Sequence, residues 1–224
     1  RKGICRAVMD LQMEDFRRQG GRFCVLGTGY DSPPYHIYKS YGFESMQPNS
    51  GAMYYMRDEQ FWNDFLANGE VTCSSLAWED WSDLCALMAC PTADWYRSRR
   101  HCIFGPQCFE FSLLRDVQDF QEARHQARVL RGAGGVVGYG VLKSDDDWKG
   151  NTWLLDLNVH PEFTDQTRLL VEGFEWPDRK VSVWLEATSS VARALIELGF
   201  SEEARLTEMF MRNGIAQDVV VLSR

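Results

Sequence analysis

Ile37-Tyr-Lys-Ser-Tyr-Gly-Phe43 and Ala194-Leu-Ile-Glu-Leu-Gly-Phe200 are two stretches of helical pattern that end in the same Gly-Phe pair. An apolar stretch typical of a strand precedes each of them: Phe23-Cys-Val-Leu26 before the first and Val183-Trp-Leu-Glu186 before the second. Both strands follow a predicted helix. The order helix, strand, short helix, Gly-Phe therefore occurs twice, which indicates a duplicated unit.

A further predicted strand follows each Gly-Phe, and the two strands are matched as Tyr54-Tyr-Met-Arg57 and Met209-Phe-Met-Arg212. Coincidence between two ordinary strand–helix–strand segments is the alternative explanation. The shared Gly-Phe and the matching strand beyond it favour duplication.

Apolar spacing, glycine and proline predict the other elements. Helices are expected at residues 4–19, 31–41, 78–90, 113–126, 164–176 and 189–198. Strands are expected at residues 23–28, 53–57, 70–76, 129–130, 136–143, 153–159, 181–186 and 218–222 and around Phe210, with residues 91–108 irregular. This order predicts an α/β fold with a mixed sheet that has antiparallel and parallel parts.

The composition limits the classes of protein to which this chain can belong. Its 224 residues are 45% hydrophobic and 25% charged, which is ordinary for a soluble globular protein. No run of eighteen apolar residues or export signal is visible, so no membrane partner is expected. The net charge of −8 disfavours nucleic-acid binding, although residues 95–100 combine two aromatics with three arginines.

Seven cysteines, none of them in a Cys-x-x-Cys pair, favour a reduced, cytoplasmic protein. His101, Cys102 and Cys108 could be taken as a fragment of a metal site. Their spacing fits no zinc template, so no metal is expected.

Ile37-Tyr-Lys-Ser-Tyr-Gly-Phe43 resembles the Leu-Tyr-x-x-x-Gly-Phe stretch in the C-terminal half of GNAT acetyltransferases, and Arg1-Lys-Gly-Ile-Cys5 is similar to the end of that family's pyrophosphate-binding motif. The resemblance covers nearly the whole chain. It implies the GNAT fold in one partial copy (residues 1–57), a connector (58–69) and one complete but degenerate copy (70–224). The first copy lacks the family's leading strands, so the sequence is expected to be a fragment or to follow an upstream segment.

The resemblance also implies acetyl-CoA as the co-substrate, bound at the start of the first helix. Backbone N–H groups at a helix N-terminus attract phosphate oxygens, and small residues let the phosphate approach. The expected cofactor-binding residues are Arg1, Lys2, Gly3, Ile4, Cys5, Arg6 and Asp31. Two of them depart from the family: Cys5 replaces a smaller residue, and Asp31 stands where an Asn is common. A plain helix cap would also explain Asp31, and a solvated helix start would explain Arg1 and Lys2.

Tyr38 stands where the family often has the general acid of acetyl transfer. A phenol, with an ordinary pKa of about 10, is a poor base at neutral pH but can protonate a leaving thiolate. A packing role is the alternative for Tyr38, and Tyr35 and Tyr41 are expected to pack.

The second copy departs from the family at both functional positions. The segment after Leu157-Asn-Val-His-Pro161 has no glycine, and Leu195 stands where the first copy has Tyr38. His160 could be a base, but a lone histidine beside a proline at a strand end favours a structural role.

The resemblance therefore implies an acetyl-CoA-dependent N-acetyltransferase acting on a small primary amine, with an active N-terminal unit and a structural C-terminal unit. A non-catalytic acyl-CoA-binding or regulatory module is the alternative, because the fold alone does not fix the function. A homodimer is left open.

Overall fold

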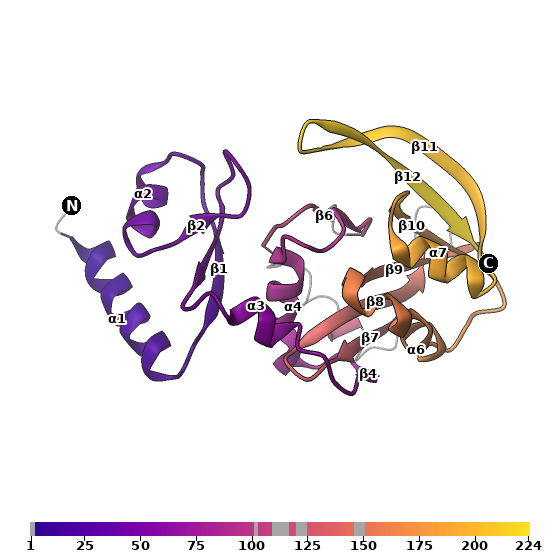
Figure 1. Ribbon diagram of the computed structural model, residues 1–224, viewed down its shortest axis with the longest axis horizontal. Coiled ribbons are helices and arrows are strands. Elements are labelled where there is room, and N and C mark those ends of the chain that lie inside the picture. Colours follow the sequence, from indigo (N-terminus) through magenta and orange to yellow (C-terminus); the bar gives the residue numbers. More distant parts are fainter. Residues whose placement is uncertain (1–2, 101–102, 109–116, 120–124, 146–150) are drawn as a thin grey trace. The chain divides into compact units, whose positions relative to one another are not determined.

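The structure is a computed structural model that describes residues 3–100, 103–108, 117–119, 125–145 and 151–224 (Figure 1). The chain forms two compact units, an N-terminal unit (Arg1–Asp64) and a C-terminal unit (Phe65–Arg224). The boundary between them falls inside the predicted connector, where the short helix α3 (Phe61–Phe65) lies. His101, Cys102 and most of the helix expected at residues 113–126 lie outside the described residues.

Before α3, the described part of the N-terminal unit has two helices and a small antiparallel sheet. Its elements are α1 (Ile4–Arg18), β1 (Phe23–Gly27), α2 (Pro33–Ser40), β2 (Glu44–Ser45) and β3 (Ala52–Met56). The strands lie in the order β1-β3-β2, and β3 pairs antiparallel with both neighbours. Its core is formed by Met9 and Met13 of α1 together with Tyr35, Phe43 and Met53.

The Gly-Phe pair ends α2 in a specific way. Gly42 has a φ of 92°, the left-handed conformation that glycine adopts without strain. The amide of Phe43 donates to the carbonyl of Tyr38 at 3.2 Å, and the amide of Gly42 donates to the carbonyl of Lys39 at 3.1 Å. The Phe43 ring also lies 6.0 Å from the Tyr38 ring. This is the hydrogen-bonding pattern of a Schellman helix end.

The C-terminal unit has a seven-stranded sheet and a separate two-stranded sheet. Its strands are β4 (Thr72–Ser75), β5 (Tyr96–Ser98), β6 (Ile103–Phe104), β7 (His125–Arg131), β8 (Val136–Ser144), β9 (Thr152–Val159), β10 (Lys180–Glu186), β11 (Ser201–Arg212) and β12 (Ile215–Ser223). Its helical segments are η1 (Trp78–Asp80), α4 (Trp81–Ala89), η3 (Pro161–Gln166), α6 (Thr167–Glu172) and α7 (Ser190–Glu197).

The order in the large sheet is β11-β12-β10-β9-β8-β7-β4, while β5 and β6 form a separate hairpin. All neighbours pair antiparallel except β9 and β10, which are parallel. The core draws on β8, β9, β10 and β12 and on α6 and α7, with Leu155, Val183, Leu195 and Leu222 fully buried. The expectation of a mixed sheet is confirmed for this unit.

The two units share one chain path. The order α1-β1-α2-β2-β3 corresponds to α6-β10-α7-β11-β12, and the last strand lies between the other two in both sheets. The helix end is also the same, since Gly199 has a φ of 93° and the amide of Phe200 donates to the carbonyl of Leu195 at 3.1 Å. Leu195 therefore occupies the position of Tyr38 at the helix end.

The match between the final strands needs a correction. Residues 209–212 lie in β11, the first strand after Gly-Phe, whereas residues 54–56 lie in β3, the second strand. The counterpart of β11 is the two-residue strand β2, and that of β3 is β12. The sequence comparison missed this because β2 is too short to show a strand pattern.

Three predicted elements differ from the structure. The helix expected at residues 164–176 ends at Glu172, before Gly173. A Cβ at Gly173 would lie 2.7 Å from the Sγ of Cys73, so this close approach requires glycine. Gln126 belongs to β7 rather than to a helix, and the region 91–108 contains the hairpin β5–β6.

The long hairpin β11–β12 borders the sheet (Figure 1). Its outer strand β11 is exposed along most of its length, and the register shifts between Glu202 and Ala204 and between Leu206 and Phe210. Glu208, inside the second irregularity, has a φ of 54°, and its amide donates to Asp218 at 3.0 Å. β11 is therefore an irregular edge strand.

Within the described part of the chain, no helix is long and apolar enough to cross a membrane.

Cys24 and Cys5 are expected to differ strongly in reactivity toward alkylating agents. Burial raises the pKa of the Cys24 thiol to about 11, so only about a thousandth of it is thiolate at pH 8, whereas Cys5 is exposed. Brief treatment with iodoacetamide at pH 8, followed by peptide mass spectrometry, should label Cys5 first. In urea both should react alike; equal rates in the folded protein would contradict the burial of Cys24.

Candidate functional site

The predicted phosphate-binding residues lie at the beginning of α1. Arg1 and Lys2 are outside the described residues, and Gly3 is the N-cap with a φ of 74°. The carbonyl of Gly3 accepts the first helical hydrogen bond from the amide of Ala7, at 3.0 Å. A left-handed residue at this position favours glycine for conformational reasons alone.

The first turn of α1 offers backbone donors at an open surface. Ile4, Cys5 and Arg6 are all exposed, and the first amides of an α-helix have no partner within the helix. A helix N-terminus also attracts negative charge. The start of α1 thus brings together Gly3, Ile4, Cys5 and Arg6, and its chemistry suits a phosphate.

Tyr41 connects this helix end to α2. Its hydroxyl donates to the backbone carbonyl of Arg6 at 3.0 Å or to the carboxylate of Asp10 at 2.7 Å. The hydrogen bond to Asp10 is also the main reason that the pKa of Tyr41 is raised. The end of α2 therefore lies against the first two turns of α1.

Tyr38 lies on α2 and packs, half-buried, against the core of the N-terminal unit. Among the described residues its hydroxyl has no hydrogen-bond partner, whereas the hydroxyls of Tyr35 and Tyr41 are both engaged, that of Tyr35 with Ser45 at 3.0 Å. A proton donor must keep its hydroxyl available for the substrate. Of these three tyrosines, Tyr38 is the one that meets this requirement.

Asp31 does not cap α2. The N-cap is Ser32, whose Oγ accepts a hydrogen bond from the amide of Tyr35 at 3.4 Å. Asp31 has a φ of 56° and lies 3.0 Å from Nε2 of His36, and both side chains are exposed. The interpretation of Asp31 as a plain cap is wrong, and its contact with a cofactor stays a prediction.

In the C-terminal unit, the segment that follows β9, where a phosphate loop would be needed, is the short helix η3. It begins at Pro161, after His160, and contains no glycine. Leu195, the counterpart of Tyr38, is fully buried. Neither a glycine loop nor a proton donor is present at the equivalent positions.

Both ring nitrogens of His160 are used by the fold. Nδ1 accepts the amide N–H of Glu162 at 3.3 Å, so the ring proton is on Nε2, which donates to Oγ1 of Thr92 at 2.8 Å. Burial lowers the pKa of His160, which keeps the ring neutral. This geometry fits the structural role expected for His160 and leaves no free nitrogen to act as a base.

β9 and β10 separate at their carboxyl ends. Their parallel pairing covers residues 152–155 and 180–183 only, while β9 continues to Val159 along β8 and β10 continues to Glu186 along β12. We call the opening beyond residues 155 and 183 the strand fork. The carboxyl ends of parallel strands are the usual place for ligands in α/β sheets.

Two buried carboxylates at the strand fork were not predicted. Asp156 on β9 is 4% exposed, and Glu186 at the end of β10 is 1% exposed. The signal was visible in Leu154-Leu-Asp-Leu157, where an acid interrupts an apolar strand. Buried carboxylates require partners, and sequence alone does not reveal which residues supply them.

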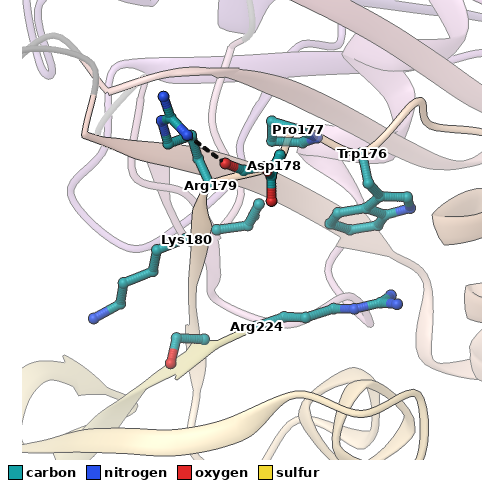
Figure 2. A pocket seen from close by; sticks show the side chains of 8 residues that line it. Trp176, Pro177, Asp178, Arg179, Lys180 and Arg224 are labelled. Carbon is teal, nitrogen blue, oxygen red and sulfur yellow. Dashed lines mark hydrogen bonds between the residues drawn. The ribbon is translucent and has the colours of Figure 1, made fainter.

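A hollow of about 630 Å³ lies at the opposite end of β10 (Figure 2). Its lining residues are Trp176, Pro177, Asp178, Arg179, Lys180, Val181, Ser223 and Arg224. The cations are partly engaged within the fold: Lys180 pairs with Glu203, and the Arg224 guanidinium lies 5.2 Å from the Trp176 ring centre. This hollow is at the amino end of β10, away from the strand fork.

Among the described residues, no group of three or more His, Cys, Asp and Glu side chains could hold a metal ion.

No family model matches the sequence, and no curated protein matches it. Similar solved structures include ribosomal-protein-S5-alanine acetyltransferase from Vibrio fischeri, with 15% identity, a TM-score of 0.53 and coverage of 70% of this chain and 93% of that chain. A GNAT-family acetyltransferase from Streptococcus pneumoniae has 14% identity, a TM-score of 0.53 and coverage of 69% and 99%. A GNAT phosphinothricin acetyltransferase from Sinorhizobium meliloti, in complex with AcCoA, has 14% identity, a TM-score of 0.50 and coverage of 69% and 87%.

Identities this low establish the fold rather than a shared reaction. Nearly the full length of each neighbour is matched, so the similarity covers a whole domain and not a shared motif. Over about 70% of its length, this chain has the fold of the GNAT acetyltransferases.

Proposed function

We propose that this protein is an acetyl-CoA-dependent N-acetyltransferase that acetylates a primary amine. In this proposal the N-terminal unit, a partial GNAT copy, carries the chemistry, and the C-terminal unit is a complete copy that supports it. The observation that carries the proposal is the fold shared with acetyltransferases, one of which is described in complex with AcCoA.

The N-terminal unit supplies the parts that the reaction needs. Gly3 and the amides after it, at the start of α1, would bind the pyrophosphate of acetyl-CoA, and Arg6 would add charge. The amine nitrogen would attack the thioester carbon, the C–S bond would break, and the hydroxyl of Tyr38 would protonate the leaving thiolate. The amine would lose its proton to solvent.

The C-terminal unit supports this division because it lacks both parts. Its η3 segment has no glycine, and buried Leu195 replaces Tyr38. A leucine has no proton to donate, and a backbone without glycine does not admit a phosphate as closely.

Replacing Gly3 by glutamate is expected to abolish acetyl-CoA binding. The new carboxylate would repel phosphate, and a side chain at a φ of 74° would be strained. Isothermal titration of acetyl-CoA into the full chain measures the effect, and release of free CoA thiol with a panel of primary amines measures turnover.

Gly20→Glu is the matched control for this experiment. Gly20 has a φ of 79° and, like Gly3, has no atom within 4 Å of an added Cβ, but it lies at the other end of α1. The control should bind acetyl-CoA as the native chain does. Absence of acetyl-CoA binding to the native chain would refute the proposal.

A non-catalytic acyl-CoA-binding or regulatory module is the second candidate. The carboxylates of Glu186 and Asp156 at the strand fork favour this second candidate. Both already accept hydrogen bonds from the chain itself, so neither is free to act in a reaction of the C-terminal unit. Acetyl-CoA binding without thiol release for any amine tested would identify this case.

A further inference from the structure

We infer that residues 94–100 are a built-in occupant of the strand fork, held by Asp156 and Glu186, and that the fork is therefore closed to external ligands. The inference concerns the C-terminal unit, and it rests on the proposed function only in the choice of acetyl-CoA as a probe.

The segment lies against both arms of the strand fork. Its central part, β5, contacts β9 as well as β10. The three residues of β5, Tyr96, Arg97 and Ser98, are between 1% and 5% exposed. Among the described residues, it is this buried segment that lies against both diverging strands.

Asp156 binds the segment from the β9 arm. It is the first β9 residue beyond the parallel pairing, and it accepts hydrogen bonds from the hydroxyl of Ser98 at 2.5 Å and from the amides of Arg99 at 3.0 Å and Arg100 at 3.2 Å. Consecutive backbone amides converging on one carboxylate are the arrangement by which proteins bind an external anion. Here the protein supplies both partners.

Glu186 binds the segment from the β10 arm. Its carboxylate accepts the amide of Trp95 at 2.9 Å and the guanidinium of Arg212 at 2.9 Å. The Arg99 guanidinium lies 4.7 Å from the ring centre of Trp184 on β10. The segment is thus attached to the strand fork at Trp95 and at residues 98–100.

Both carboxylates are consequently engaged as structural anions. A carboxylate that already accepts two or three hydrogen bonds has few lone pairs left for an external ligand. The strand fork resembles a ligand cleft in its position, but its ligand is the chain itself.

Amide hydrogen exchange in the full chain, followed by NMR, tests the inference without any ligand. Asp156→Asn keeps the shape but places an amide NH₂ opposite the N–H donors, so exchange at Arg99 and Arg100 should rise at least about tenfold, as expected for the loss of one charge-assisted hydrogen bond. The control is Asp165→Asn, at an exposed acid that accepts from Gln166, and it should leave both amides unchanged. Unchanged exchange in Asp156→Asn would overturn the inference.

Acetyl-CoA provides the second arm. Saturating acetyl-CoA should leave exchange at Trp95, Arg99 and Arg100 as it is. Faster exchange at these amides would show that the strand fork opens for the cofactor and would overturn the inference. Absence of acetyl-CoA binding would instead refute the proposed function. The Asp156→Asn comparison would still test whether residues 94–100 occupy the strand fork.

Discussion

Replacing Arg97 by methionine should destabilise the C-terminal unit by about 3–5 kcal/mol, because several buried carbonyls would lose their donor together. Arg97 is 1% exposed, and its guanidinium donates to the backbone carbonyls of Leu87, Met88, Cys90, Ala93 and Asp94. Three of these carbonyls belong to the last turn of α4 or to its cap. The side chain therefore completes the end of a helix that has no left-handed glycine to do so.

The expected loss is large because several acceptors would lose a donor together. An unsatisfied buried polar group costs about 1–3 kcal/mol, and methionine fills the volume without replacing any donor. Burial lowers the pKa of Arg97 to about 10, so at neutral pH the native side chain still carries its charge.

Urea unfolding followed by tryptophan fluorescence measures the change. Arg179→Met is the matched control, because Arg179 is exposed and its guanidinium donates to the neighbouring Asp178 carbonyl; a change within about 0.5 kcal/mol is expected. If Arg97→Met stays within that margin of the native protein, the buried guanidinium does not hold α4.

Replacing Tyr38 by phenylalanine should lower turnover by about 10²- to 10⁴-fold, the usual contribution of a general acid. Only the hydroxyl is removed, and this hydroxyl has no partner among the described residues, so the fold and acetyl-CoA affinity should stay as they are. A fall in kcat with an unchanged Kd for acetyl-CoA would show that the hydroxyl acts in the reaction and not in binding.

Tyr30→Phe is the control for this measurement. Tyr30 is 48% exposed and lies just before α2, so the same hydroxyl is removed from the same unit. It should leave turnover unchanged. Full turnover in Tyr38→Phe would remove Tyr38 from the reaction and reduce it to a packing residue.

Local patterns in the sequence predicted much of the fold. Gly42 and Gly199 marked the helix ends because a left-handed residue is needed there, and the apolar runs of β8, β9 and β10 predicted buried strands. The failures were also local. Gln126 was assigned to a helix although it pairs with Leu142 in the sheet, since partners distant in sequence decide strand pairing.

The candidate site in the N-terminal unit could be predicted because its chemistry is carried by adjacent residues. Gly3 and Arg6 belong to one helix start, and Tyr38 to one helix end. The strand fork could not be predicted, because Asp156 meets Ser98 across 58 positions of sequence. Only a fold that brings β5 beside β9 reveals what the acid binds.

The irregular edge strand β11 also bears on how this protein behaves at high concentration. A twelve-residue strand at the end of the sheet order, paired on one side with β12 and with Met209 and Met211 exposed, is a template to which another chain could add a strand and begin an aggregate. The shifted register and the left-handed Glu208 interrupt its row of donors and acceptors. Because of these two breaks, β11 offers a foreign strand no long uninterrupted ladder.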